Sequence, residues 1–161
     1  MNTRRDAITV RADRPVVLSL RAVSVCYRAG VSGCAARARV LIAIDLEISD
    51  GEIVGIVGAR RSGKSTLLQC AGGLLEPDDG VVELSGPVLL VDEPFIGDRV
   101  GRRELHRALE AARTTGMSVL LASSHADAVH RAASRVLVLE RGRLMPPLAG
   151  GRSVDSPSGE P

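Results

Sequence analysis

The stretch GEIVGIVGARRSGKSTLLQC, residues 51–70, constrains the fold more than any other part of the chain. It reads as a short apolar strand, a glycine-bounded loop and a helix, and Gly58-x4-Gly63-Lys64-Ser65 has the spacing of a phosphate-binding loop. Glycines let a backbone wrap around a phosphate, and the free amide N–H groups of a helix N-terminus attract the anion. The alternative is an ordinary glycine-rich turn between a strand and a helix.

The use of lysine favours the phosphate-binding interpretation. The chain has 21 basic residues, and Lys64 is the single lysine among them. Because lysine is a compact charge on a flexible stem and arginine a planar fork, the two do not replace each other at a tight phosphate site. We expect Lys64 to reach the β- and γ-phosphates of a nucleotide and Ser65 to ligate Mg²⁺. The predicted nucleotide-binding residues of the loop are Gly58, Ala59, Arg60, Arg61, Ser62, Gly63, Lys64, Ser65 and Thr66.

The order of apolar runs predicts an α/β fold. Strands alternate with helices across residues 52–134, which is typical of a parallel sheet with flanking helices. PVLLVDEP, residues 87–94, is a continuous apolar run that predicts a parallel strand buried on both faces. Residues 15–30, 39–48 and 81–86 predict a small antiparallel flank, and residues 135–144 a hairpin that turns at 141–142. Residues 102–116 predict an amphipathic helix with an apolar stripe of Leu105, Ala108, Leu109 and Ala112.

Polar side chains at strand ends supply the other candidate site residues. Asp92 and Glu93 end an apolar run, where charges are costly unless they meet a cation, so Asp92 is a candidate Mg²⁺ ligand and Glu93 a candidate base for water. His125 ends another apolar run and is a candidate contact for the γ-phosphate, since parallel strands end on one rim. Tyr27 is a candidate for stacking on a base. The alternatives are a solvated pair of carboxylates, a bland histidine and a half-buried strand tyrosine.

Composition excludes several classes of protein. The net charge of +2 is too small to argue for a nucleic-acid partner, and an aromatic content of 1% removes a stacking platform for single strands. No apolar run approaches the roughly 18 residues that cross a bilayer, and no apolar stretch marks a signal peptide, so we expect a cytoplasmic protein. Cys26, Cys34 and Cys70 lack metal-ligand spacing and are expected to be reduced thiols.

Taken together, these motifs resemble the ATP-binding cassette (ABC) ATPases, a group with a P-loop NTPase sheet. The resemblance covers roughly residues 16–144: VSVCYRAG resembles the segment that stacks on adenine, and residues 45–86 resemble the first half of the family. PVLLVDEPFIGD resembles the Walker B strand and D-loop, which places Asp98 in the D-loop, and SVLLASSHADAV resembles the switch-histidine segment. The resemblance implies ATP and Mg²⁺ as ligands, with Glu93 and His125 as catalytic residues.

The chain departs from this family between Gly86 and Pro87. Here the family holds the Q-loop, a helical subdomain and the signature motif, and the signature motif of one subunit closes the ATP site of its partner. A homodimer of this chain would lack both closing motifs, so the resemblance implies a second ABC subunit that supplies one and a separate membrane-spanning protein. The strand lost with the Q-loop would leave residues 87–94 as an exposed apolar edge. Arg61 stands where the family usually has glycine, which would strain the loop if that position needs a positive φ.

The sequence thus predicts an ABC-type nucleotide-binding domain over residues 16–144, a flexible N-terminus over 1–15 and a disordered tail over 145–161. We expect it to bind Mg-ATP and to hydrolyse it slowly as the ATP-binding component of an ABC transporter-like system, peripheral on the inner face of the membrane through a partner. The alternatives are a non-catalytic ATP-binding or structural partner subunit and a decayed remnant of a full-length ABC ATPase. DNA-repair ATPases share the head architecture, but the charge balance and the lack of coiled-coil heptads argue against them.

Overall fold

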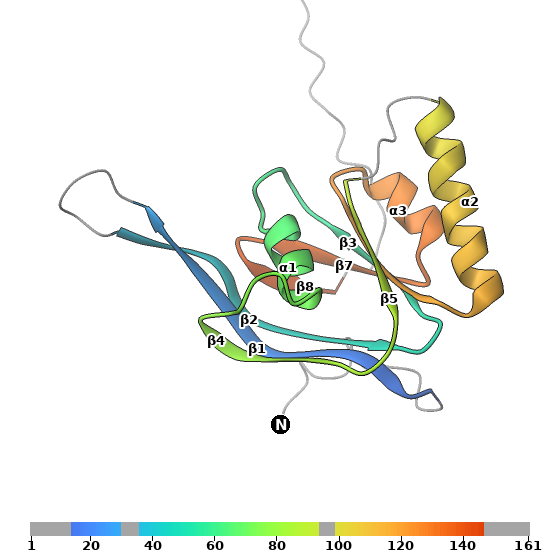
Figure 1. Ribbon diagram of the computed structural model, residues 1–161. Coiled ribbons are helices and arrows are strands. Elements are labelled where there is room, and N and C mark those ends of the chain that lie inside the picture. The colour runs from blue at the N-terminus through green and yellow to red at the C-terminus, as the bar shows by residue number, and fades with distance from the viewer. Residues whose placement is uncertain (1–13, 30–35, 94–98, 147–161) are drawn as a thin grey trace, which may run out of the picture.

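The computed structural model describes residues 14–29, 36–93 and 99–146 (Figure 1). Asp98 and Cys34, to which the sequence assigns a D-loop role and a free thiol, lie outside these residues. The elements in chain order are β1 Val16–Ala29, β2 Ala36–Ser49, β3 Ile53–Val57, α1 Lys64–Ala71, β4 Asp79–Leu84, β5 Val88–Asp92, α2 Arg99–Thr115, β6 Ser118–Ser123, α3 Ala126–Ala132, β7 Arg135–Glu140 and β8 Arg143–Met145.

The predicted α/β sheet is confirmed. Its strand order is β5-β6-β3-β7-β8, and the pairs β5·β6, β6·β3 and β3·β7 are all parallel. β8 returns antiparallel to β7 through a turn in which Arg141 has φ 48° and Gly142 has φ 75°, the hairpin expected at these positions. Because β3, β5 and β6 run the same way, the residues that follow them, at 58, 93 and 124, gather at one rim of the sheet.

The antiparallel flank is also confirmed. β1 lies between β2 and β4 in a second sheet of order β2-β1-β4, so residues near the N-terminus pair with the strand that follows α1. This flank and α1 lie over one face of the parallel sheet, and α2 and α3 lie over the other (Figure 1). The result is a layered arrangement with a core on each side of the parallel sheet.

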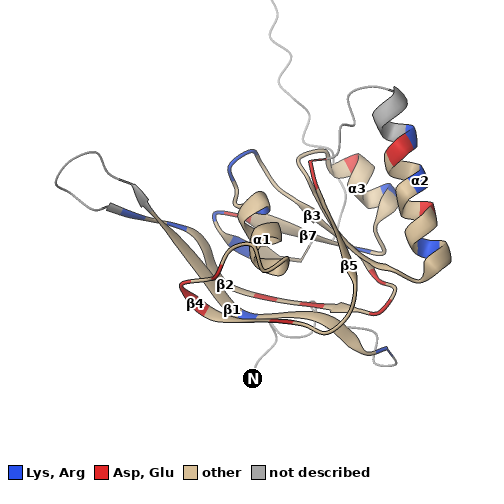
Figure 2. Cartoon of the chain, in the orientation of Figure 1, with Lys and Arg blue, Asp and Glu red and all other residues tan. Residues whose placement is uncertain are grey.

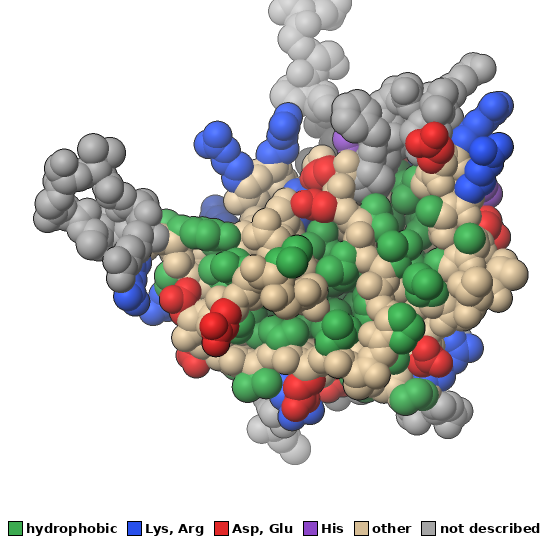
Figure 3. Space-filling view, in the orientation of Figure 1, with side chains coloured by type: hydrophobic (Ala, Val, Ile, Leu, Met, Phe, Trp, Pro, Cys, Tyr) green, Lys and Arg blue, Asp and Glu red, His purple; other side chains and the backbone are tan. Residues whose placement is uncertain are grey.

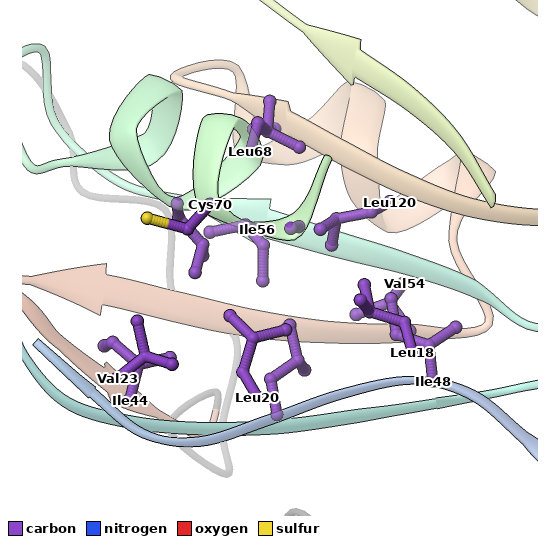
Figure 4. Close-up of a cluster of buried hydrophobic side chains, with 14 of the residues drawn as sticks. Leu18, Leu20, Val23, Ile44, Ile48, Val54, Ile56, Leu68, Cys70 and Leu120 are labelled. Carbon is purple, nitrogen blue, oxygen red and sulfur yellow. The ribbon is translucent and has the colours of Figure 1, made fainter. Parts of the chain in front are cut away.

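The strand alternation explains the two cores. In β3, Val54 and Ile56 face the flank and α1, whereas Ile53 and Val57 face α2 and α3. Figure 4 shows the first of these clusters, in which side chains of β1, β2, β3, β6 and α1 meet. Its labelled members are Leu18, Leu20, Val23, Ile44, Ile48, Val54, Ile56, Leu68, Cys70 and Leu120. Burial raises the pKa of the Cys70 thiol, and both Cys26 and Cys70 are free, as expected.

The prediction that the strand with Asp92 is buried on both faces is wrong. Residues 88–91 are only half-buried, because β5 pairs with β6 alone and forms the edge of the described sheet. The exposed apolar edge expected from the missing Q-loop strand is therefore present. Figure 3 shows hydrophobic side chains at the surface around β5. Leu74, Val81 and Leu84, in neighbouring segments, are also exposed.

The amphipathic helix forms at the predicted position, with one correction. Leu109 and Ala112 of α2 are buried and Leu105 is half-buried, but Ala108 is exposed and does not belong to the stripe. Positions 105, 109 and 112 repeat every three or four residues, so position 108 lies at the margin of the stripe. Gly116 ends the helix with φ 70°. No helix in the described ranges combines the length and apolar character needed to cross a bilayer.

Candidate functional site

The loop over residues 58–63 joins the carboxyl end of β3 to the first turn of α1. Gly63 precedes the helix with φ 105°, and a Cβ there would lie 2.9 Å from the Val40 carbonyl oxygen. A Cβ on Gly58 would lie 2.5 Å from the Leu139 carbonyl oxygen. Both glycines of the sequence pattern are therefore required, one for its backbone conformation and contacts and the other for its close approach to β7.

Lys64 turns back over this loop. Its side chain is 5% exposed, and its ammonium donates to the carbonyl oxygens of Gly58 and Ala59, both at 2.9 Å. The same Nζ lies 3.1 Å from Oε1 of Glu93. A buried charge needs such partners, and here three oxygens surround the ammonium at the centre of the loop. The arrangement presents a cation where the sequence pattern expects phosphates.

The loop also has unused hydrogen-bonding capacity. The Ser62 hydroxyl oxygen is buried and has no hydrogen-bond partner among the described residues. Gly63 supplies no side-chain cap, and the first backbone N–H of α1 that pairs within the helix is that of Leu67, to the Gly63 carbonyl. Unpaired first-turn amides and an orphan hydroxyl fit a phosphate group, which accepts hydrogen bonds.

The remaining loop positions vary in exposure. Thr66 is buried with Lys64, whereas Ala59, Arg60, Arg61 and Ser65 are exposed. Figure 2 shows the positive charge at the tip of the loop between β3 and α1. Ser65 therefore presents its hydroxyl to solvent beside the loop, which is suitable for a metal that keeps several water ligands.

Asp92 and Glu93 lie at the same rim as the loop. Asp92 is the last residue of β5, pairs with Ala122 of β6 and is exposed. Glu93 continues the ladder through its N–H to the Ala122 carbonyl at 2.8 Å, and its side chain is 40% exposed. The structure thus brings together Lys64 and Glu93 directly, with Asp92 adjacent to Glu93.

The environment of Glu93 keeps it ionised. Partial burial raises the pKa of its carboxyl, but the backbone N–H of Ser124, the Lys64 ammonium and the Ser124 hydroxyl outweigh that effect and lower the pKa below its ordinary value. Its Oε2 accepts from the Ser124 N–H at 3.1 Å, the Ser124 hydroxyl at 3.2 Å and, at a longer 3.4 Å, the Ser123 hydroxyl. At neutral pH the group is a carboxylate that accepts hydrogen bonds.

Sequence reasoning missed Ser123 and Ser124 as site residues. They sit directly before His125 at the end of β6, and His125 is exposed and donates its backbone N–H to the Ser123 hydroxyl at 3.1 Å. His125 reaches the expected rim, but β6 ends at Ser123, two residues before it. The sequence SSH could have indicated two hydroxyl groups at this rim. Only the strand order shows that β6 lies beside β5 and brings these serines next to Glu93.

Tyr27 reaches the phosphate loop from the flank. The residue is 43% exposed, and its hydroxyl makes a long 3.4 Å contact with the Thr66 hydroxyl in the first turn of α1. An exposed aromatic ring beside the first turn of α1 is available for stacking on a base. The base-stacking role of Tyr27 stays a prediction.

The loop carries backbone strain at Arg61. This residue has φ 65°, in the left-handed region where a Cβ is disfavoured. Strain is expected here if this position needs a positive φ, and the φ of Arg61 is indeed positive. The adjacent Arg60 has no positive φ, although it is also exposed and carries the same charge.

We expect Arg61→Gly to stabilise the chain. Relief of the left-handed strain, about 1–2 kcal/mol, exceeds the entropy cost of glycine, about 0.5–1 kcal/mol. The melting temperature should rise by about 1–4 °C, measured by differential scanning calorimetry. Arg60→Gly is the matched control, since it removes the same charge without relieving strain, and it should lower the melting temperature. Equal stabilisation by both changes would attribute the effect to charge and not to the backbone.

Comparisons with known proteins extend these observations. The ABC transporter family model matches residues 41–136. LolD of Bacteroides thetaiotaomicron, a lipoprotein-releasing system ATP-binding protein, is 57% identical over 51 residues, which are 32% of this chain and 23% of LolD. YxeO of Bacillus subtilis, a probable amino-acid import ATP-binding protein, is 47% identical over 68 residues, 42% of this chain and 25% of YxeO. The chain therefore covers well under two thirds of these curated relatives.

Solved structures share the fold. The dimeric bacterial ABC transporter cassette MJ0796 superposes with a TM-score of 0.69 at 15% identity, over 79% of this chain and 96% of that one. The same cassette in a post-hydrolysis state bound to ADP and Pi gives a TM-score of 0.68 at 17% identity, over 79% of this chain and 96% of that one. At this identity the likeness shows the arrangement of strands and helices alone.

Proposed function

The chain belongs to the ABC transporter family, and on that premise we propose that it binds Mg-ATP and hydrolyses it slowly. The family match confirms the resemblance drawn from the sequence motifs. One observation carries the proposal: the buried Lys64 ammonium lies 3.1 Å from Oε1 of Glu93, so the candidate phosphate ligand and the candidate base share one point at the sheet rim. A purely structural turn has no need for this pair.

The loop supports nucleotide binding through phosphate recognition. Lys64 would exchange its carbonyl partners, Gly58 and Ala59, for the β- and γ-phosphates, because it is a flexible cation within reach of the loop centre. The unpaired amides at the start of α1 and the orphan hydroxyl of Ser62 would donate to the phosphate oxygens. Tyr27 would stack on the base, since its exposed ring lies beside Thr66.

Ser65 and Asp92 are a donor set that suits a magnesium ion, which needs few protein ligands. Both are exposed at the rim, and the described residues contain no group of three or more His, Cys, Asp or Glu side chains that could hold a metal. Mg²⁺ is ordinarily held by one or two protein oxygens together with phosphates and waters. Bound there, Mg²⁺ would neutralise charge that develops on the phosphates.

We assign to Glu93 the role of general base for the attacking water. Its carboxylate is ionised and one residue beyond Asp92, so it can orient a water and accept its proton. His125 is the second candidate catalytic residue. Its backbone N–H donates to the Ser123 hydroxyl, which in turn contacts Glu93, so His125 lies at the same rim. Lys64 would stabilise negative charge on the transferred phosphoryl group.

We further propose an assembly around this chain. β4 leads into β5 through residues 85–87 alone, so the chain offers no segment between them that could close a neighbour's site. A second ABC subunit would supply a signature motif and a separate membrane-spanning protein would anchor the complex, with this chain cytoplasmic or peripheral on the inner face. Asp98 would act in the D-loop, within a nucleotide-binding domain over residues 16–144.

The short connection between β4 and β5 also favours a second candidate function. A chain that binds ATP but does not hydrolyse it, either alone or with a partner, would be a non-catalytic ATP-binding or structural subunit. Turnover of wild-type protein, alone and mixed with a full-length ABC subunit, separates the two functions. Hydrolysis by this chain alone, or turnover in the mixture above that of the full-length subunit by itself, favours the ATPase, and tight binding without any such hydrolysis favours the non-catalytic subunit.

Calorimetric titration with ATP, with and without Mg²⁺, tests the proposal. Wild type should bind Mg-ATP with a micromolar to submillimolar Kd, and Ser65→Ala should weaken Mg-ATP about tenfold while leaving Mg-free ATP unchanged, because one charged-oxygen contact is lost. Ser134→Ala, an exposed serine before β7 at the opposite end of the sheet, is the matched control. Absence of binding by a cooperatively melting wild type would overturn the proposal, and a chain that does not melt cooperatively would be a decayed remnant.

A further inference from the structure

We propose that Ser123 and Ser124 position the Glu93 carboxylate, holding one of its oxygens so that the other is presented to the water. This inference rests on the proposed function, since it assigns positioning residues to the same site. It names side chains to which neither the sequence motifs nor the comparisons give a role. Neither serine touches the loop over residues 58–63 through a described hydrogen bond, so their action is through Glu93.

The two carboxylate oxygens of Glu93 have different partners. Oε2 receives the Ser124 N–H at 3.1 Å, the Ser124 hydroxyl at 3.2 Å and the Ser123 hydroxyl at 3.4 Å. Oε1 receives the Lys64 ammonium at 3.1 Å and no other donor among the described residues. Donors that converge on one oxygen fix the rotation of the carboxylate as well as its position.

A support of this kind is needed because the backbone of Glu93 leaves the side chain poorly held. Glu93 follows the edge strand β5, has φ 38° and is 40% exposed, so packing does not restrict its rotamers. A base that is misplaced by about 1 Å can lose a hundredfold in rate. Ser123 is the last residue of β6, the neighbour of β5 inside the sheet, and is fully buried, and Ser124 follows it directly. A rigid strand thereby locates a residue on an exposed edge.

The division between the oxygens predicts what happens when Lys64 turns to the phosphates. Oε1 then loses its one partner among the described residues and can accept a hydrogen bond from water, while Oε2 keeps its serine donors. The Ser123 hydroxyl also accepts the His125 N–H at 3.1 Å, so the same group links the turn that carries His125 to Glu93. The serine pair therefore sets the two candidate catalytic residues relative to each other.

Steady-state ATP hydrolysis by Ser124→Ala and Ser124→Thr tests the inference. Loss of the hydroxyl should lower kcat about five- to tenfold and leave KM for Mg-ATP within about twofold, because the phosphate contacts are intact. Threonine keeps a hydroxyl at the same position and should restore most of kcat. Ser123→Ala should lower kcat as well. Its matched control is Ser118→Ala, a buried serine at the other end of β6 that binds the backbone of Ser49 and Gly51, which should leave kcat unchanged.

A double-mutant cycle measured by unfolding tests the contact between Ser124 and Glu93 without relying on ATP turnover. Ser124→Ala and Glu93→Gln should be non-additive by about threefold or more in the unfolding equilibrium constant, as contacting residues are. Additive effects, or an unchanged kcat in Ser124→Ala, would overturn the inference. If wild type binds Mg-ATP but does not hydrolyse it, the catalytic part of the proposed function fails, and the cycle alone decides whether the serines hold Glu93.

Discussion

We expect Lys64→Ala to remove Mg-ATP binding at concentrations where the wild type is saturated. The ammonium is 5% exposed and surrounded by loop oxygens, so no other described cation can take its place at the centre of the loop. Truncation of one partner of a buried charged pair weakens binding by about 2 kcal/mol or more, which is at least about thirtyfold in Kd. Isothermal titration calorimetry of Mg-ATP into both proteins measures the change.

Two comparisons make this prediction specific. Arg21→Ala removes a positive charge from an exposed ion pair with Glu83 in the antiparallel flank, and it should leave Kd unchanged. Lys64→Arg keeps the charge but not the shape, and it should still lose most of the affinity because a planar fork does not fit the space of an ammonium. Undiminished binding by a folded Lys64→Ala protein would mean that ATP binds elsewhere and that the loop is not the nucleotide site.

The loop was predictable because its chemistry is local. The spacing from Gly58 to Ser65, the strand before it and the helix after it all lie within one stretch of sequence, and the structure has the loop at the stated residues. The strain at Arg61 was expected from the family resemblance on the condition that this position needs a positive φ, and Arg61 has φ 65°. Local rules suffice where neighbours in the chain are also neighbours in space.

The errors arose where neighbours in space are distant in sequence. The run of apolar residues in β5 indicated burial on both faces, but its half-buried state depends on which strands flank it, and β6 flanks it on one side only. The serine donors to Glu93 lie about 30 residues further along the chain, and nothing in their letters indicates that β6 is the partner of β5. Strand order, not motif, determines both features.

We expect Glu93→Gln to abolish most ATP turnover while keeping ATP binding. The amide cannot accept a proton from water, and loss of a general base lowers the rate about 10²- to 10⁴-fold. Binding should be no weaker than in wild type, because glutamine has the same shape and Lys64 is no longer paired with a carboxylate. The measurements are phosphate release and Mg-ATP calorimetry on the same preparations.

The combination of the two readouts distinguishes Glu93 from residues that merely support the fold. Glu83→Gln, at an exposed carboxylate of β4, should change neither turnover nor Kd. If Glu93→Gln loses binding along with turnover, the carboxylate holds the loop in shape and is not a base for water. If it hydrolyses ATP at the wild-type rate, a different residue activates the water, and Asp92 becomes the next carboxylate to substitute because it occupies the adjacent position at the end of β5. The change in Kd also tests whether the Lys64–Glu93 pair competes with the phosphates: binding should become tighter in Glu93→Gln, both because Lys64 is released and because the carboxylate no longer repels the phosphates, and an unchanged Kd would contradict that competition.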